Sequence, residues 1–311
     1  MGTTFRVRVV ASAMLLSPAA RQRLAGRIDA ELELLEARLS HYRPDSDVSR
    51  FNRLSAGEAL SVSVETLEVL AAARELSRLS DGAFDVTVAP LVDAWGFGPS
   101  GPVAALPSDA RIETLRGRVG YDKVLLDLGR RELRKRTPGL TLNLSAIGKG
   151  YAVDRVAALL RELDIADYLV EIGGELRAAG RNAAGRPWQV AIESPRSGAR
   201  RLQRFVVLDG QGLATSGEYR TLRRIGGSRV SHTVDPRSGR PVEHALASVS
   251  VIASSCMRAD GLATALNVLG PQEGWALAQE HGLAALFVSA TSGDDFEERV
   301  TPAFRPFLGL P

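Results

Sequence analysis

The spacing of hydrophobic residues along the chain predicts four helices. Leucine and isoleucine recur at helical spacing, on one face, between Arg21 and Leu39. A second stripe ends at Asp81-Gly82, where glycine suits the left-handed turn that closes a helix. The last stripe opens at Asp260 and is expected to stop at Gly270-Pro271. The four helices are expected at about 21–39, 64–79, 151–163 and 260–269.

Short apolar runs predict strands between these helices. The first ten residues, MGTTFRVRVV, alternate apolar and polar side chains as a strand does. The other predicted strands are KVLLDL, LTLNL, YLVEI, WQVAIE, RFVVLDG and ALASVSVIAS, at 123–128, 140–144, 168–172, 188–193, 204–210 and 245–254. Residues 40–52 and the connector up to about Pro107 are rich in turn-forming residues and are expected as loops.

Helices and strands mix without a regular βαβ repeat. The predicted fold class is therefore α+β, with mixed, largely antiparallel sheets and packed helices. The chain contains no internal repeat and no clear linker, which predicts a single domain over residues 1–311.

Composition narrows the class of protein. Hydrophobic residues make up 45% and charged residues 24% of the chain, which excludes disordered and fibrous proteins. The net charge of +3 and the 5% aromatic content do not indicate a nucleic-acid partner. The single cysteine, Cys256, excludes an internal disulfide and is expected to be a buried small hydrophobe.

No apolar run of the sequence is long enough to span a membrane. The first residues also lack the charged start of a signal peptide. Either the protein is cytoplasmic, or the sequence begins after a removed export signal.

Candidate chemistry concentrates in the third quarter of the chain. The motifs TSGEYR, SHTVDPRSGRP and MRADGLATALNVLG fall within about sixty residues. Asp260 and Thr264 are spaced i and i+4, which puts a carboxylate and a hydroxyl on one helix face. These hard oxygen ligands suit a Mg²⁺ ion that keeps positions free for phosphate oxygens. The alternative is that Asp260 only complements the dipole at a helix N-terminus.

His232 is the candidate general base. Among the four histidines, it alone lies in a polar loop with a carboxylate, Asp235, three residues further on. The alternative is a loop histidine that binds the backbone.

Glycine-rich turns offer candidate anion sites. LNLSAIGKGYAVDR joins a strand to a helix N-terminus and carries Lys149, and EIGGELRAAG exposes backbone between strands. The first is not a P-loop, because it lacks the first glycine and the terminal serine or threonine of that motif.

In their order along the chain, these motifs resemble those of the ApbE-type FAD:protein FMN transferases. The resemblance runs from MGTTF at Met1 through YRPDSDVSRFN, GAFDVTVAPLVDAWGFGP, SAIGKGYAVDR, EIGGEL, TSGEYR, HTVDPRSGRP and ADGLATAL. It implies a T-fold-like architecture and a Mg²⁺-dependent enzyme that binds FAD as its substrate. Such an enzyme transfers FMN to a threonine or serine hydroxyl of a target flavoprotein and releases AMP. The resemblance also implies periplasmic localisation, a lipid anchor to the inner membrane on a removed N-terminal segment, and an acceptor such as a subunit of a membrane redox complex.

The resemblance assigns roles to individual residues. The catalytic residues would be His232 and Asp260. The metal ligands would be Asp260, Thr264 and the backbone carbonyl of Ala146. The flavin contacts would be Met1, Tyr42, Ala83, Phe84, Asp85, Asn143, Lys149 and Val234. His41, beside Tyr42, is a secondary candidate for substrate contact.

The sequence departs from the family pattern at two positions. Asn143 stands where many members carry aspartate, and Ala263 stands where some carry a second acidic residue. Three functions stay open: the transferase, a Mg²⁺-dependent FAD pyrophosphatase that gives FMN and AMP, and a non-catalytic flavin-binding assembly protein. The presence of Asp260, Thr264 and His232 argues against the third.

Overall fold

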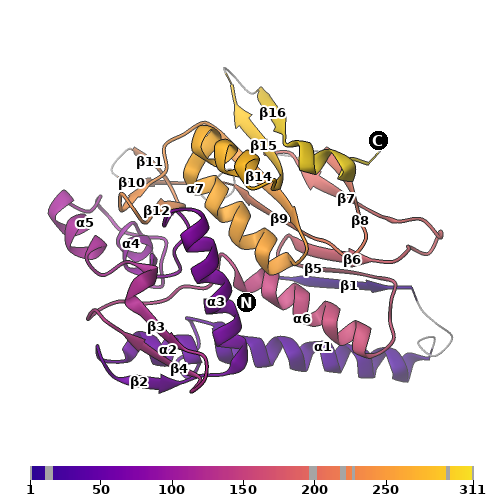
Figure 1. Cartoon of the computed structure of the whole chain (residues 1–311), viewed down its shortest axis with the longest axis horizontal. Coiled ribbons are helices and arrows are strands. Elements are labelled where there is room, and N and C mark those ends of the chain that lie inside the picture. The colour runs from indigo at the N-terminus through magenta and orange to yellow at the C-terminus, as the bar shows by residue number, and fades with distance from the viewer. Residues whose placement is uncertain are drawn as a thin grey trace.

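The computed structural model describes residues 2–10, 17–195, 202–217, 222–225, 228–291 and 295–309 (Figure 1). Its helices are α1 (Pro18–Leu39), α2 (Asp47–Arg53), α3 (Val64–Leu79), α4 (Ala89–Ala94), α5 (Asp109–Arg116), α6 (Gly148–Glu162) and α7 (Cys256–Glu280), with 3-10 helices η2 (Tyr121–Lys123) and η3 (Pro302–Phe307). Its strands are β1 (Phe5–Val9), β2 (Ala59–Ser61), β3 (Val124–Asp127), β4 (Glu132–Lys135), β5 (Tyr168–Ile172), β6 (Glu175–Ala179), β7 (Trp188–Glu193), β8 (Leu202–Leu208), β9 (Gly212–Gly217), β10 (Leu222–Ile225), β11 (Ser228–Ser231), β12 (Val234–Asp235), β13 (Arg240–Pro241), β14 (Leu246–Ala253), β15 (Ala284–Ala290) and β16 (Phe296–Val300).

The core is built on a seven-stranded antiparallel sheet in the order β1-β5-β6-β9-β14-β15-β16. Side chains alternate between its faces: along β5, Val170 and Ile172 join one hydrophobic cluster and Leu169 joins another. Helices α6 and α7 cover the first face (Figure 1), and the β7–β8 hairpin and η3 cover the second. The predicted α+β class with largely antiparallel sheets is confirmed.

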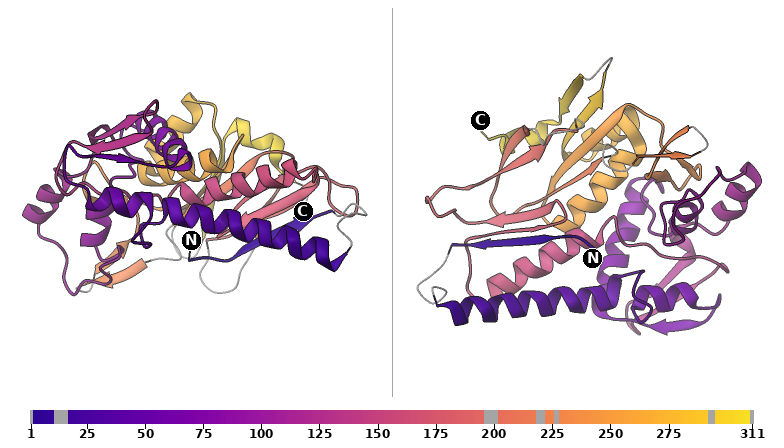
Figure 2. Two further views of the ribbon diagram at one scale, coloured as in Figure 1. Left: turned by 90° about the horizontal axis from the view of Figure 1, so that it is seen from below. Right: turned by 180° about the vertical axis from the view of Figure 1, so that it is seen from behind.

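Outside the α6–α7 layer, α1 packs on α6 and α3 packs on α7 (Figure 2). Serine side chains begin five of the helices, each by accepting a hydrogen bond from the backbone N–H three residues further on. These residues are Ser17, Ser46, Ser63, Ser108 and Ser255. Each such cap contributes about 1 kcal/mol to helix stability. The helices predicted at 21–39 and 64–79 are confirmed within a few residues.

Helix α7 begins earlier and runs further than predicted. It begins at Cys256 rather than Asp260, because the Ser255 side chain accepts a hydrogen bond from the N–H of Arg258. At Gly270 φ is 77°, so the helix kinks there, and Pro271 opens a second helical segment. Gly270-Pro271 therefore bends the helix instead of ending it. The prediction that Cys256 is buried is confirmed.

The strand predicted at 140–144 is wrong. The side chain of Asn52 takes the place of a neighbouring strand: its Nδ2 donates to the Leu142 carbonyl at 3.0 Å, and its Oδ1 accepts from the Leu142 N–H at 2.7 Å. The next N–H, of Asn143, donates to the Val86 carbonyl at 2.8 Å. These contacts fix the backbone that leads into the SAIGKG turn.

Several elements were not predicted, and α2, α4 and β4 are three of them. Helix α2 lies where turns were expected, and α4 lies within the segment before the predicted connector. Strand β4 pairs with β2 and β3. Its buried residues are Leu133 and Lys135, so a lysine in the interior hid the strand alternation.

The central sheet takes strands from residue 5 to residue 300, and the single domain over 1–311 stays a prediction. Within the described ranges, no helix has the length and apolarity needed to cross a membrane.

Candidate functional site

A cavity of about 770 Å³ opens where α6, α7, β6 and β9 meet the loops at 83–86 and 232–236. It brings together the predicted site residues of the described chain: Tyr42, Ala83, Phe84, Asp85, Asn143, Ala146, Lys149, His232, Val234, Asp260 and Thr264. Met1 lies outside the described residues. The residues thus share one cavity, and the role of each stays a prediction.

Asp260 lies in the second turn of α7 and is 4% exposed. Its Oδ2 accepts a hydrogen bond from the N–H of Gly150 at 3.0 Å, and its Oδ1 lies 3.5 Å from Lys149 Nζ. The helix begins four residues earlier, and the effect of the helix dipole fades beyond the first turn. A role in complementing the dipole therefore does not account for Asp260.

Helix α6 holds α7 at two points one turn apart. At the first, the carboxylate of Asp154 accepts the N–H groups of Cys256 and Met257 at 2.9 and 2.8 Å, and Arg177 pairs with it at 2.6 Å. At the second, Gly150 lies so close to α7 that an added Cβ would be 2.4 Å from the Cys256 carbonyl oxygen. The position of Asp260 in the cavity follows from this close packing.

Lys149 is the second residue of α6, and its ammonium group is surrounded by oxygen atoms. Its Nζ lies 3.3 Å from the Ser145 carbonyl, 3.1 Å from Glu175 Oε1 and 3.5 Å from Asp260 Oδ1. Burial alone would lower the pKa of Lys149, but the carboxylates of Asp260 and Glu175 raise it above its ordinary value. The lysine is therefore charged at neutral pH.

Glu175 is the site residue that the sequence reasoning missed. It begins β6, lines the cavity and is 4% exposed. Its Oε2 has no hydrogen-bond partner among the described residues. Burial, and next the negative charge of Asp260, raise the pKa of Glu175 to about 8 against the opposing charge of Lys149. A signal was present, since the EIGGEL motif places an acidic residue directly after two glycines at a strand start.

The donors predicted for a metal are Asp260 and Thr264, one turn apart on α7, and the carbonyl of Ala146. The described ranges contain no group of three or more histidine, cysteine, aspartate or glutamate side chains able to hold a metal ion. One carboxylate beside a hydroxyl and a carbonyl nevertheless fits Mg²⁺, which commonly uses one or two carboxylates and completes its shell with water and substrate phosphate. The unpartnered Oε2 of Glu175 places a further oxygen atom in the same cavity.

Asp85 is held by hydrogen bonds from Thr87, in its own loop, and from Tyr121, at the start of η2. Its Oδ1 accepts the N–H and the hydroxyl of Thr87, both at 2.7 Å, and its Oδ2 accepts the N–H of Tyr121 at 2.8 Å. Burial raises the pKa of Asp85, and these hydrogen bonds oppose that rise. Phe84 beside it is 2% exposed, so this segment is part of the cavity wall.

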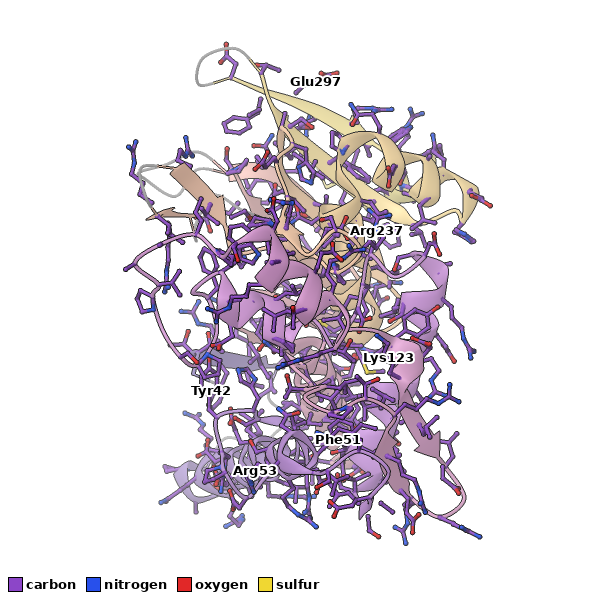
Figure 3. All side chains as sticks on the ribbon, turned by 90° about the vertical axis from the view of Figure 1, so that its left-hand side faces the viewer. Tyr42, Phe51, Arg53, Lys123, Arg237 and Glu297 are labelled. Carbon is purple, nitrogen blue, oxygen red and sulfur yellow. The ribbon has the colours of Figure 1, made fainter. Side chains whose placement is uncertain are left out.

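Tyr42 differs from the rest of the wall because it is 69% exposed. It lies at the margin of the molecule (Figure 3), with its ring 4.1 Å from that of His41. Tyr42 also borders a second cavity, of about 350 Å³, which contains His41. An exposed aromatic face at the entrance suits the stacking of a planar ring.

His232 follows β11, and its ring meets the ring of Phe97 edge-on at 6.3 Å between centroids. The carboxylate of Asp235, which the sequence suggested as the partner of His232, binds Arg237 through the backbone N–H at 2.8 Å and the guanidinium at 2.9 Å. Asp235 therefore shapes the loop that carries His232.

The comparisons with known proteins agree with one another. Residues 1–287 match the model of the ApbE family. The FAD:protein FMN transferase of Vibrio cholerae is 40% identical over 308 residues, which is 99% of this chain and 90% of that protein. The corresponding protein of Haemophilus influenzae is 38% identical, over 98% of this chain and 88% of its own length.

Solved structures give the same result. The fold is similar to that of the flavin transferase ApbE from Vibrio cholerae, with a TM-score of 0.89 and 39% identity over 99% of this chain and 96% of that one. It is equally similar to the apo form of the flavinyl transferase ApbE from Pseudomonas stutzeri, with a TM-score of 0.89 and 45% identity over 100% of this chain and 95% of that one.

Proposed function

The chain belongs to the ApbE family, and from this premise we propose that it is a transferase that moves FMN from FAD to a hydroxyl of a target flavoprotein. The acceptor is a threonine or serine, the new bond is a phosphoester, and AMP is released. The observation that supports this reaction best is the meeting of Lys149, Asp260 and Thr264 with His232 in one cavity. Pyrophosphate cleavage needs positive groups beside the phosphates that offset their negative charge. It also needs a base that takes the proton of the attacking hydroxyl.

In the proposed reaction the acceptor hydroxyl oxygen forms a bond to the FMN phosphorus. The bond from that phosphorus to the bridging oxygen breaks, and AMP leaves with the electron pair. His232 takes the proton of the hydroxyl. Lys149 would bind a non-bridging phosphate oxygen, and Asp260, Thr264 and the Ala146 carbonyl would hold Mg²⁺. When bound, Mg²⁺ supplies further charge neutralisation on the pyrophosphate.

The experiment is an incubation of the protein with FAD, Mg²⁺ and a candidate acceptor domain. The acceptor mass and the released nucleotide are then measured. The transferase is supported if the mass of the acceptor rises by one FMN, located on a threonine or serine, and AMP is released. Free FMN and AMP without a labelled acceptor would identify a pyrophosphatase instead, and FAD binding without turnover would leave only a flavin-binding protein.

We also propose, from the family resemblance alone, that the protein works in the periplasm. Its acceptor would be a subunit of a membrane redox complex, and an N-terminal lipid anchor would hold the precursor at the inner membrane. Fractionation of cells that produce the precursor tests this, and recovery only from the cytoplasm would contradict it.

A further inference from the structure

The ammonium group of Lys149 occupies a cage of oxygen atoms. A lysine has three N–H donors, and three acceptors lie within 3.5 Å of Nζ: the Ser145 carbonyl, Glu175 and Asp260. Carboxylates and a carbonyl are also the donors that a divalent cation takes. Asp260 belongs both to this cage and to the predicted metal ligands, and Ser145 precedes the third predicted ligand, Ala146.

This position is unfavourable for a lysine unless the carboxylates offset it. Lys149 is the second residue of α6, and the N-terminus of a helix disfavours a positive charge. Conversely, Glu175 and Asp260 are each 4% exposed, and two buried carboxylates need a counter-charge. The lysine and the two acids therefore stabilise one another.

Asp260 cannot serve both cations fully. A divalent ion held by Asp260 would meet the positive charge of Lys149, whose Nζ lies only 3.5 Å from the same carboxylate. At such distances like charges repel strongly, even near a protein surface. Glu175 is the closer partner of Lys149, at 3.1 Å, and can retain the ammonium when its contact with Asp260 is lost.

We propose that Lys149 competes with the divalent cation for Asp260, and that Glu175 is the positioning residue that retains Lys149 when the cation binds. The inference rests on the proposed function in one respect: the FAD pyrophosphate would attract the same ammonium away from Asp260. Metal and FAD would then strengthen each other's binding by the same factor, as thermodynamic linkage requires.

The test uses Mg²⁺ alone, in FAD-free protein, with isothermal titration calorimetry. Lys149→Met removes the competitor and should tighten Mg²⁺ binding by roughly tenfold. Glu175→Gln leaves Asp260 as the single carboxylate partner of Lys149 and should weaken Mg²⁺ binding by roughly threefold. The titrations are made at about pH 8.5, where the Glu175 carboxyl is largely ionised.

The matched control is Glu171→Gln. Glu171 lines the same cavity, but its Oε1 accepts a hydrogen bond from the N–H of Gly174, at 3.2 Å. This variant loses the same charge and should keep Mg²⁺ affinity within about twofold of the unaltered protein. A second readout is FAD affinity with and without Mg²⁺, and Lys149→Met should reduce the enhancement by Mg²⁺.

Unchanged or weaker Mg²⁺ binding by a folded Lys149→Met protein would overturn the competition, as would no binding by either protein. Equal effects of Glu175→Gln and Glu171→Gln would overturn the role of Glu175. Circular dichroism checks folding, and if Lys149→Met does not fold, the comparison of the two glutamate variants decides. If the variants show the expected changes in Mg²⁺ affinity but the protein does not transfer FMN, only the proposed function is contradicted. If the protein transfers FMN but the variants leave Mg²⁺ affinity unchanged, only this inference is contradicted.

Discussion

Asp85 and Asp260 line the same cavity and are buried to a similar degree, at 7% and 4% exposure, yet the fold uses them differently. Asp85 accepts two hydrogen bonds from Thr87 in its own loop and one from Tyr121, at the start of η2. Asp260 accepts one backbone N–H and faces a lysine. A carboxylate that accepts most of its hydrogen bonds from the protein forms part of the cavity wall. One that keeps free acceptor sites can bind a ligand.

The largest expected effect is on turnover, and it distinguishes Asp260 from Asp85. Asp260→Asn keeps an acceptor for the Gly150 N–H but removes the charge. We expect Mg²⁺-dependent turnover to fall by about a thousandfold. Steady-state kinetics across a Mg²⁺ titration measures the loss.

Asp85→Asn is the matched control. The substitution turns one of the two oxygens that accept hydrogen bonds from Thr87 and Tyr121 into a donor. We therefore expect a loss of about 2–3 kcal/mol in the free energy of unfolding, and a smaller loss of turnover than for Asp260→Asn. Chemical denaturation measures the change in the free energy of unfolding. The comparison fails if Asp85→Asn removes turnover as completely as Asp260→Asn.

His232→Ala is expected to slow chemistry by about a hundredfold, because a general base contributes on this order. FAD binding should be nearly unchanged. Single-turnover kinetics and FAD fluorescence quenching report the two quantities separately. An equal loss of both would make His232 a binding residue.

Gly150→Ala tests how Asp260 is positioned. The new Cβ would lie 2.4 Å from the Cys256 carbonyl oxygen and 2.8 Å from Asp260 Cβ, so α7 has to shift. We expect a loss of about 1–3 kcal/mol in stability and about a tenfold loss of turnover. Gly26→Ala, on α1, is the control: nothing lies within 4 Å of its added Cβ, so it should be neutral or stabilising by up to about 1 kcal/mol. Equal behaviour of the two variants would show that α6 does not set the position of α7.

The smallest effect concerns pH. The folded-state pKa of Glu175 is raised to about 8 from the ordinary 4.5, so between these values the folded protein binds the extra proton. The stability that this bound proton contributes is therefore lost as pH rises through this window. Glu175→Gln has no carboxyl to titrate, so it removes this dependence of stability on pH. The stability of Glu175→Gln relative to the unaltered protein should therefore increase as pH rises from about 4.5 to about 8. Thermal denaturation across this range checks it, and a constant difference would contradict the shift. The raised pKa of Lys149 acts only above this range.

Sequence reasoning succeeded where chemistry and spacing are local. The amphipathic stripes gave α1 and α3, and the i, i+4 spacing gave Asp260 and Thr264 on one face. It failed where a contact with a residue far away in the sequence, and not the local pattern, determines the structure. The side chain of Asn52 takes the place of a strand beside 140–144, and a buried lysine hides β4.

Glu175 was missed for a related reason. Its importance depends on the meeting of β6 with the first turn of α6 and the second turn of α7, which sequence spacing does not contain. The motif order did recover Tyr42, Lys149, His232 and Asp260, which come from four separate motifs and line one cavity.

The most direct test of the central claim is the mass of an acceptor flavoprotein after incubation with FAD and Mg²⁺, with the unaltered protein and with Asp260→Asn in parallel. We expect an acceptor heavier by one FMN on a threonine or serine, with AMP released, for the unaltered protein only. An unlabelled acceptor with the unaltered protein, or equal labelling by both, would contradict it.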